Sequence, residues 1–332
     1  MRRNGMRHTS LAVLLMLLCA AALAKETWRL KDGRVWEPVN ASPREQYGLA
    51  IAKLKDLVRT GQADAVVDVL SELKDEFPQY VGPDLDLFVE GELQYYEDHY
   101  PKALKKYEKL LKDYPGSEFA EAVLEREFKI AKAYLGGRKK KVLGLFKISG
   151  RADGIEMMER ISDRAGLDDP NSIGLRAAIA VAEHYELREK HLEAYLKWSE
   201  IASYWETGPI GKKALLRMAE NNLLAYNQAR PHRRPLLDAS KLISAKTYFE
   251  KYALRYPAEA KRHKIPEKLK QIDEQMAHKQ LTTGQYYQRM GKTQAANLYF
   301  DTVVQNWPRT KAAETARQAR EQNANGNDAS GK

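Results

Sequence analysis

The chain has few of the residues and motifs that carry covalent chemistry. It contains a single cysteine, Cys19, among 332 residues, so no intramolecular disulfide can stabilise the fold. The sequence also lacks a nucleotide-binding glycine loop, a Gly-x-Ser-x-Gly nucleophile turn and a His-Glu-x-x-His metal helix. No pair of carboxylates stands out for acid–base work. These absences argue against an enzyme, and they suggest neither a cofactor nor a metal.

Long apolar runs are equally scarce, because the one extended run lies near the N-terminus, from Leu11 to Leu23. Three arginines, at positions 2, 3 and 7, precede it, and the small residues Ala22 and Ala24 end it. This order of features is typical of a secretory signal peptide. We therefore expect residues 1–24 to be removed and the mature chain to be exported and soluble.

Cleavage after Ala24 would remove Cys19 and leave a mature chain without cysteine. The alternative is a lipoprotein signal that is cut before Cys19 and anchors the chain through acyl groups on this residue. Leu17 and Leu18 disfavour that alternative, because a lipoprotein signal usually has a small residue just before the cysteine.

The net charge of the chain is modestly positive. It falls from +10 to +7 on cleavage, since three arginines and no acidic residue are lost. A dispersed positive charge on an exported protein suits anionic lipid, cell-wall polymer or acidic protein surfaces, and export argues against nucleic acid as a partner.

The chain is rich in one repeated spacing. A small or branched residue is followed by an apolar residue at the fourth place and an aromatic residue at the eleventh, and this occurs five times. Both offsets fall on one stripe of an α-helix, and the proline that follows four of the five aromatics cannot continue that helix. The units start at Val66, Ala103, Ala194, Ala245 and Ala296; their fourth-place residues are Leu70, Tyr107, Trp198, Phe249 and Phe300, and their eleventh-place residues are Phe77, Tyr114, Trp205, Tyr256 and Trp307.

A lone amphipathic helix cannot bury its stripe, so five such helices predict stacked helical hairpins. We expect an all-α, tetratricopeptide-like solenoid of five to six hairpins over residues 42–322, with the fourth- and eleventh-place residues in its core. Residues 25–41 predict two short extended pieces around Asp32-Gly33, with Trp28 and Trp36 packing on the first helices as a cap. The polar segment 323–332 predicts disorder.

An insertion at residues 137–152 interrupts the repeats and mixes cations with apolar residues. One interpretation is a segment that docks on a partner or an anionic membrane. The other is a long inter-helix loop whose apolar residues fold back on the solenoid while its cations stay in water. The candidate binding residues are Arg138, Lys139, Lys140, Lys141, Leu145, Phe146 and Lys147.

His184 and His191 lie seven residues apart, on one face of a predicted helix. A metal site would need a third ligand from elsewhere, and Arg188 and Lys190 between them disfavour it electrostatically. We therefore interpret both as surface histidines.

Several stretches resemble a known family. The segment Tyr286–Phe300, continued by Asn306-Trp307-Pro308-Arg309-Thr310, resembles the last repeat of the YfiO-type (BamD) proteins of the outer-membrane β-barrel assembly machinery. Tyr114-Pro115-Gly116-Ser117 and the stretch from Phe249 to Pro257 resemble earlier repeats. Members are usually lipoproteins with a cysteine just after cleavage, which Cys19 matches poorly, and the insertion is foreign to their pattern.

The resemblance implies a non-enzymatic scaffold in the periplasm, at the inner face of the outer membrane. Its partners would be the barrel insertase and unfolded outer-membrane proteins. Three rivals remain open: a generic periplasmic tetratricopeptide adaptor for cell-wall or secretion complexes (CpoB-like), a helical cell-wall hydrolase, and a protein whose basic insertion contacts the membrane directly.

Overall fold

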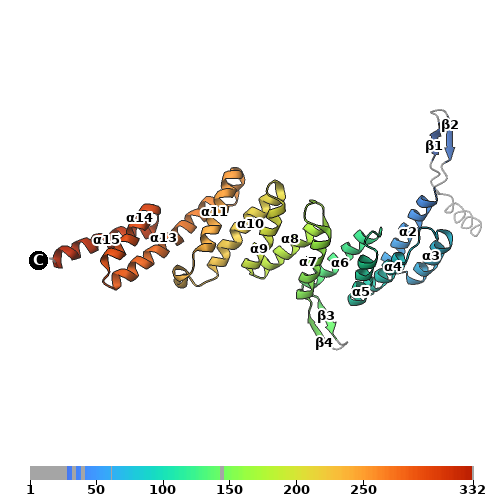
Figure 1. Cartoon of the computed structure of the whole chain (residues 1–332), viewed down its shortest axis with the longest axis horizontal. Helices are drawn as coiled ribbons and strands as arrows, with labels where there is room; N and C mark the ends of the chain where they lie inside the picture. The colour runs from blue at the N-terminus through green and yellow to red at the C-terminus, as the bar shows by residue number, and fades with distance from the viewer. Residues whose placement is uncertain (1–27, 32–34, 39–41, 61, 143–145, 331–332) are drawn as a thin grey trace, which may run out of the picture. The chain divides into compact units, whose positions relative to one another are not determined.

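The computed structural model describes residues 28–31, 35–38, 42–60, 62–142 and 146–330. The chain divides into two compact units, Met1–Ala120 and Glu121–Lys332. In each unit successive helices pack against one another, so the fold is an all-α helical solenoid (Figure 1). Residues 1–24, including Cys19, lie outside the described residues, and their cleavage stays a prediction.

The first unit starts with a two-stranded antiparallel hairpin in which Leu30 lies opposite Trp36. Ser42 then caps the first helix through a capping box with Glu45, and Pro43 occupies the first helical position. That Trp28 and Trp36 pack on the helices stays a prediction. The elements of this unit are β1 (Trp28–Lys31), β2 (Val35–Pro38), α2 (Pro43–Arg59), α3 (Ala63–Glu76), α4 (Pro83–Tyr96) and α5 (Tyr100–Asp113).

The second unit also consists of helical hairpins. A short strand pair is inserted into its first hairpin, and a further helix packs against its last hairpin. Its helices are α6 (Ala120–Leu135), α7 (Arg151–Ala165), α8 (Ile173–Leu187), α9 (His191–Tyr204), α10 (Gly208–Asn227), α11 (Ser240–Arg255), α12 (Pro257–Arg262), α13 (Ile265–Arg289), α14 (Thr293–Asn306) and α15 (Lys311–Ser330), with a 3₁₀ helix η1 (Pro231–Leu236) and the strands β3 (Lys139–Val142) and β4 (Phe146–Ser149).

The repeated spacing forms the second helix of five hairpins. All five first-place residues are fully buried, and so are the fourth-place aromatics Tyr107, Trp198, Phe249 and Phe300. In the first repeat Leu70 is half-buried and Val69 takes its place in the core. The seventh place is also buried in every repeat, by Leu73, Leu110, Ile201, Tyr252 and Val303.

The eleventh-place aromatics do not continue the helical stripe but end the helix. Each is the C-cap residue, with φ between −122° and −135° and ψ between 44° and 86°, and its N–H still donates to the carbonyl four residues back. A residue before proline is pushed out of the α region, which explains this backbone in four of the repeats. Phe77 is buried, whereas Tyr114, Trp205, Tyr256 and Trp307 are half-buried.

Glycines on the first helix make room for the fourth-place rings. A Cβ at Gly284 would lie 2.6 Å from Cε1 of Phe300, and a Cβ at Gly91 would clash in the same way with Tyr107. Both glycines precede their aromatic by 16 residues. The same offset from Trp198 leads to Ala182, which is fully buried in the same core cluster.

One expectation about an irregular segment differs from the structure. The insertion is an antiparallel strand pair, β3–β4, and not a long loop. At the other end of the unit α15 extends to Ser330, and the disorder of residues 323–332 stays a prediction. The buried alanines Ala312, Ala313, Ala316 and Ala319 anchor that helix, and adding residues to an existing helix avoids the cost of nucleation.

Replacing Gly284 with alanine should destabilise the second unit by about 1–3 kcal/mol, because the new methyl group collides with the ring of Phe300. Urea unfolding followed by circular dichroism measures this. Gly48→Ala in α2 is the matched control, since a Cβ there meets nothing within 4 Å and should stabilise by about 0.5–1 kcal/mol. Equal effects of the two substitutions would contradict the packing argument.

Candidate protein-binding surface

The β3–β4 hairpin leaves a closely packed base between α6 and α7. A Cβ at Gly150 would lie 2.5 Å from Cδ1 of Tyr134, and one at Gly154 would lie 2.9 Å from the carbonyl oxygen of Ala131. Gly137 has φ of 103° and ends α6, and the next N–H, of Arg138, donates to Ala133 O at 3.0 Å. These glycines allow α6 and α7 to approach with the hairpin inserted between them.

The two strands of the hairpin pair in a defined register. Lys140 lies opposite Ile148 and Val142 opposite Phe146, whereas Lys139 lies opposite Ser149 and Lys141 opposite Lys147. Three of the candidate cations therefore follow one another on β3, while Phe146 and Lys147 belong to β4.

The predicted binding residues thus lie together on one short hairpin. Arg138 and Lys139 are exposed at its base, and Ile148 keeps 46% of its surface exposed. Leu145 falls outside the described residues. The sequence predicted the mixture of cations and apolar residues but not the strand pair, because the pairing register of so short a segment is only weakly specified by its own sequence.

A second surface, not predicted from the sequence, runs along the first helices of the hairpins in the second unit. Polar side chains link α6 to α8, α8 to α10 and α10 to α13. We call this set the polar ladder. Its pairs are Arg176 with Glu125, Lys213 with Glu183 (2.8 Å), Arg217 with Glu186 (3.9 Å), Lys268 with Glu220 (2.7 Å) and Gln275 with Asn227 (3.0 Å).

Glu186 is the centre of this ladder. Its Oε1 accepts from Nε1 of the core residue Trp198 at 2.8 Å and from Nδ2 of Asn221 at 2.7 Å. Asn221 is buried, and its Oδ1 lies 3.0 Å from Nδ1 of His191. One carboxylate therefore joins the repeat core to the exposed cations of α10.

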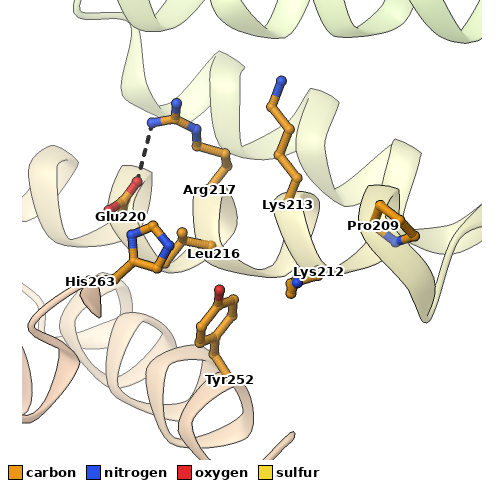
Figure 2. A pocket seen from close by; sticks show the side chains of 8 residues that line it. All are labelled: Pro209, Lys212, Lys213, Leu216, Arg217, Glu220, Tyr252 and His263. Atoms are coloured by element: carbon orange, nitrogen blue, oxygen red, sulfur yellow. Dashed lines mark hydrogen bonds and ion pairs between the residues drawn. The ribbon is translucent and has the colours of Figure 1, made fainter. Parts of the chain in front are cut away.

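A cleft of about 380 Å³ opens beside the ladder, between α10, α11 and α12 (Figure 2). Lys212 forms an ion pair with Glu259 at 2.9 Å, and this hydrogen bond raises the pKa of the Lys212 ammonium. Arg217 contacts Glu220 at 3.2 Å across the cleft wall. The lining residues are Pro209, Lys212, Lys213, Leu216, Arg217, Glu220, Tyr252 and His263.

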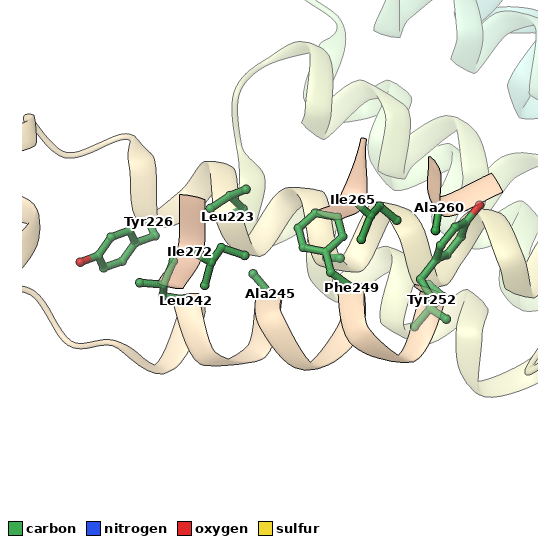
Figure 3. Close-up of a cluster of buried hydrophobic side chains, with 11 residues drawn as sticks. Leu223, Tyr226, Leu242, Ala245, Phe249, Tyr252, Ala260, Ile265 and Ile272 are labelled. Atoms are coloured by element: carbon green, nitrogen blue, oxygen red, sulfur yellow. The ribbon is translucent and has the colours of Figure 1, made fainter. Parts of the chain in front are cut away.

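The floor of the cleft is a core cluster formed by α10, α11, α12 and α13 (Figure 3). Phe249 and Ile265 fill its middle, and the ring of Tyr252 packs at one end. Tyr252 occupies the seventh place of its repeat, where the other four repeats carry Leu, Leu, Ile and Val. That hydroxyl in a position otherwise aliphatic is the sequence signal that could have found the cleft.

His184 differs from the prediction that both histidines lie on the surface, whereas His191 is half-buried. His184 is 9% exposed, and its burial lowers the pKa of the imidazole, as do the nearby charges of Arg151, Arg188 and Lys190. Its helix α8 packs against both α7 and α9, so this position faces neighbouring helices. Among the described residues, no three His, Cys, Asp or Glu side chains gather as a metal site would require.

In the part of the chain that the structure describes, no helix is both long and apolar enough to cross a membrane. Residues 223–327, from α10 to α15, match the family described as YfiO, outer membrane lipoprotein. The match begins near the end of α10, so it covers α11 to α14 and most of α15 and leaves most of α10 and the β3–β4 hairpin outside. No curated protein matches the chain.

Two solved structures are similar to the chain. One is PilW, a widely conserved type IV pilus biogenesis factor, with 16% identity, a TM-score of 0.29, and coverage of 82% of this chain and 98% of PilW. The other is the C-terminal part of a TPR repeat-containing protein from Cytophaga hutchinsonii, with 12% identity, a TM-score of 0.33, and coverage of 92% and 93%. At these TM-scores neither structure bears on function.

Glu186→Ala should destabilise the second unit by about 1–3 kcal/mol, because the indole N–H of Trp198 and the amide of Asn221 lose their common acceptor. Glu183→Ala is the matched control, since it removes an exposed pair with Lys213 and should change stability by less than about 1 kcal/mol. Urea unfolding of both variants measures the difference, and equal losses would show that Glu186 does not link core and surface.

Burial of His184 predicts that stability falls on acidification. Its pKa is lower in the folded chain than the value of about 6.5 in the unfolded chain, so the unfolded chain binds more protons between the two values. The stability that the folded chain keeps by holding His184 neutral is fully present above pH about 6.5, and it is lost as the pH falls through the folded-state pKa. Thermal unfolding across this range should show a smaller pH dependence for His184→Asn than for the wild type or the exposed-site control His278→Asn. An unchanged dependence would contradict this account.

Proposed function

We propose that the protein is a non-enzymatic scaffold of the outer-membrane β-barrel assembly machinery, which binds the barrel insertase and unfolded outer-membrane proteins at the periplasmic face of the outer membrane. The observation that carries this proposal is the match of residues 223–327 to the family described as an outer membrane lipoprotein. The matched segment contains the end of α10, the helices α11 and α12, the α13/α14 hairpin and most of α15.

The physical argument supports protein binding as the mode of action. A solenoid exposes long faces of successive helices, and such faces bind extended or helical segments. In the second unit the polar ladder connects four first helices, so a partner lying along it would meet charges of both signs. The absence of recognisable catalytic motifs from the sequence is in keeping with a scaffold.

A generic periplasmic adaptor for cell-wall or secretion complexes is the second candidate. One observation favours it: the first unit and the β3–β4 hairpin lie outside the matched segment. Partners that use those parts would differ from the partners of the matched family.

Affinity purification of the tagged protein from its own envelope in mild detergent, followed by mass spectrometry, tests the proposal. We expect a β-barrel protein with periplasmic repeat domains to copurify in near-equal amount. Recovery of cell-wall or secretion proteins without that barrel would reject the assembly role in favour of the adaptor.

A hairpin variant tests whether the insertion takes part. Lys139 and Ser149 are paired neighbours, so residues 140–148 can be replaced by a short glycine link without separating α6 from α7. If the insertion docks on a partner, this variant should keep its melting temperature and lose copurified protein. Unchanged copurification would assign partner binding to other surfaces.

A further inference from the structure

Tyr252 lines the cleft beside α10 from the side of α11. The residue is 1% exposed, yet its hydroxyl points toward Leu216, between His263 and Lys212 (Figure 2). Among the described residues this hydroxyl has no hydrogen-bond partner, and it is not one of the fully buried polar atoms, so water in the cleft can reach it. A group that enters the cleft can replace that water and accept the hydrogen bond.

The charges around the cleft favour an acidic group. The lining contains Lys212, Lys213 and Arg217 against a single carboxylate, Glu220. Burial raises the pKa of Tyr252, so its hydroxyl stays protonated at neutral pH and acts as a donor. A carboxylate already shows how such a group is held, since Glu220 bridges Arg217 at 3.2 Å and Lys268 at 2.7 Å.

The resident ion pairs do not prevent binding. Lys212 and Lys213 keep 34% and 42% of their side-chain surface exposed and are paired with Glu259 and Glu183. Ion pairs at such partly exposed positions contribute little, so an incoming carboxylate can share or replace them at small cost. It would gain the hydrogen bond from Tyr252, which none of these resident carboxylates makes.

We propose that this cleft binds an aspartate or glutamate side chain from an acidic segment of a partner protein. Tyr252 donates a hydrogen bond to the carboxylate, and Lys212 and Arg217 supply positive charge. A singly charged carboxylate fits better than a phosphate group, because Glu220 and Glu259 would repel a second negative charge. The inference rests on the proposed function, in that it assumes action by protein binding.

Fluorescence anisotropy with a dye-labelled, glutamate-rich peptide and the full mature chain tests the proposal, with a glutamine-rich peptide of equal length as reference. We expect the glutamate peptide to bind more tightly. Tyr252→Phe keeps the net charge and the ring packing, so a loss of about tenfold in affinity would report the hydrogen bond alone. Tyr286→Phe is the matched control, because Tyr286 is half-exposed on α13, outside the cleft lining, and should have no effect.

Lys212→Gln provides a second test at a partly exposed position, and it should also weaken binding of the glutamate peptide. Equal binding of both peptides, or unchanged binding by both Tyr252→Phe and Lys212→Gln, would overturn the proposal. Binding to phosphatidylglycerol vesicles or inorganic phosphate that requires Tyr252, without peptide binding, would overturn it in favour of a phosphate ligand. If the envelope partner still copurifies with Tyr252→Phe, the proposed function stands while the cleft is excluded from it.

Discussion

The fit of one large ring against one glycine is the contact on which the α4/α5 and α13/α14 hairpins depend. Phe300 and Tyr107 occupy space that a Cβ on Gly284 or Gly91 would fill. This close approach brings the two helices of each of these hairpins together, and the small first-place residue, such as Ala296, lies one turn away and is fully buried. Because core packing is dense, this contact constrains how the rest of these two hairpins packs.

That alignment also determines where the charged residues lie. The second helix of each hairpin buries its apolar stripe in the core. The polar ladder between neighbouring hairpins therefore lies on the first helices. Glu186 connects the two systems, since it accepts from the core residue Trp198 and from Asn221 on α10. The surface available to a partner is therefore held in place by the same packing that stabilises the repeat.

The repeat could be predicted from sequence because its period is local. Offsets of four and eleven identify one helix and its end, and the structure adds that the eleventh-place residue, for example Tyr256, is the cap itself. The strand pair of β3 and β4 was missed because a short basic segment with Val142 and Ile148 has weak local preference, and the close packing at its base, between Gly150 and Tyr134, joins residues 16 positions apart. The ladder was missed because its pairs join residues 30 to 51 positions apart, as with Lys213 and Glu183, and no local pattern connects residues at such distances.

Departures from the repeat can mark surfaces that folding alone does not require. Tyr252 replaces an aliphatic residue at the seventh place and brings a hydroxyl that the surrounding described residues leave without a partner. Leu110 and Val303 fill the same place in their repeats without a polar group. The hydroxyl of Tyr252 opens into the cleft, toward the cations of α10. A hydrogen-bond donor that the core does not need, at the wall of a cleft lined by cations, is better explained by recognition than by folding.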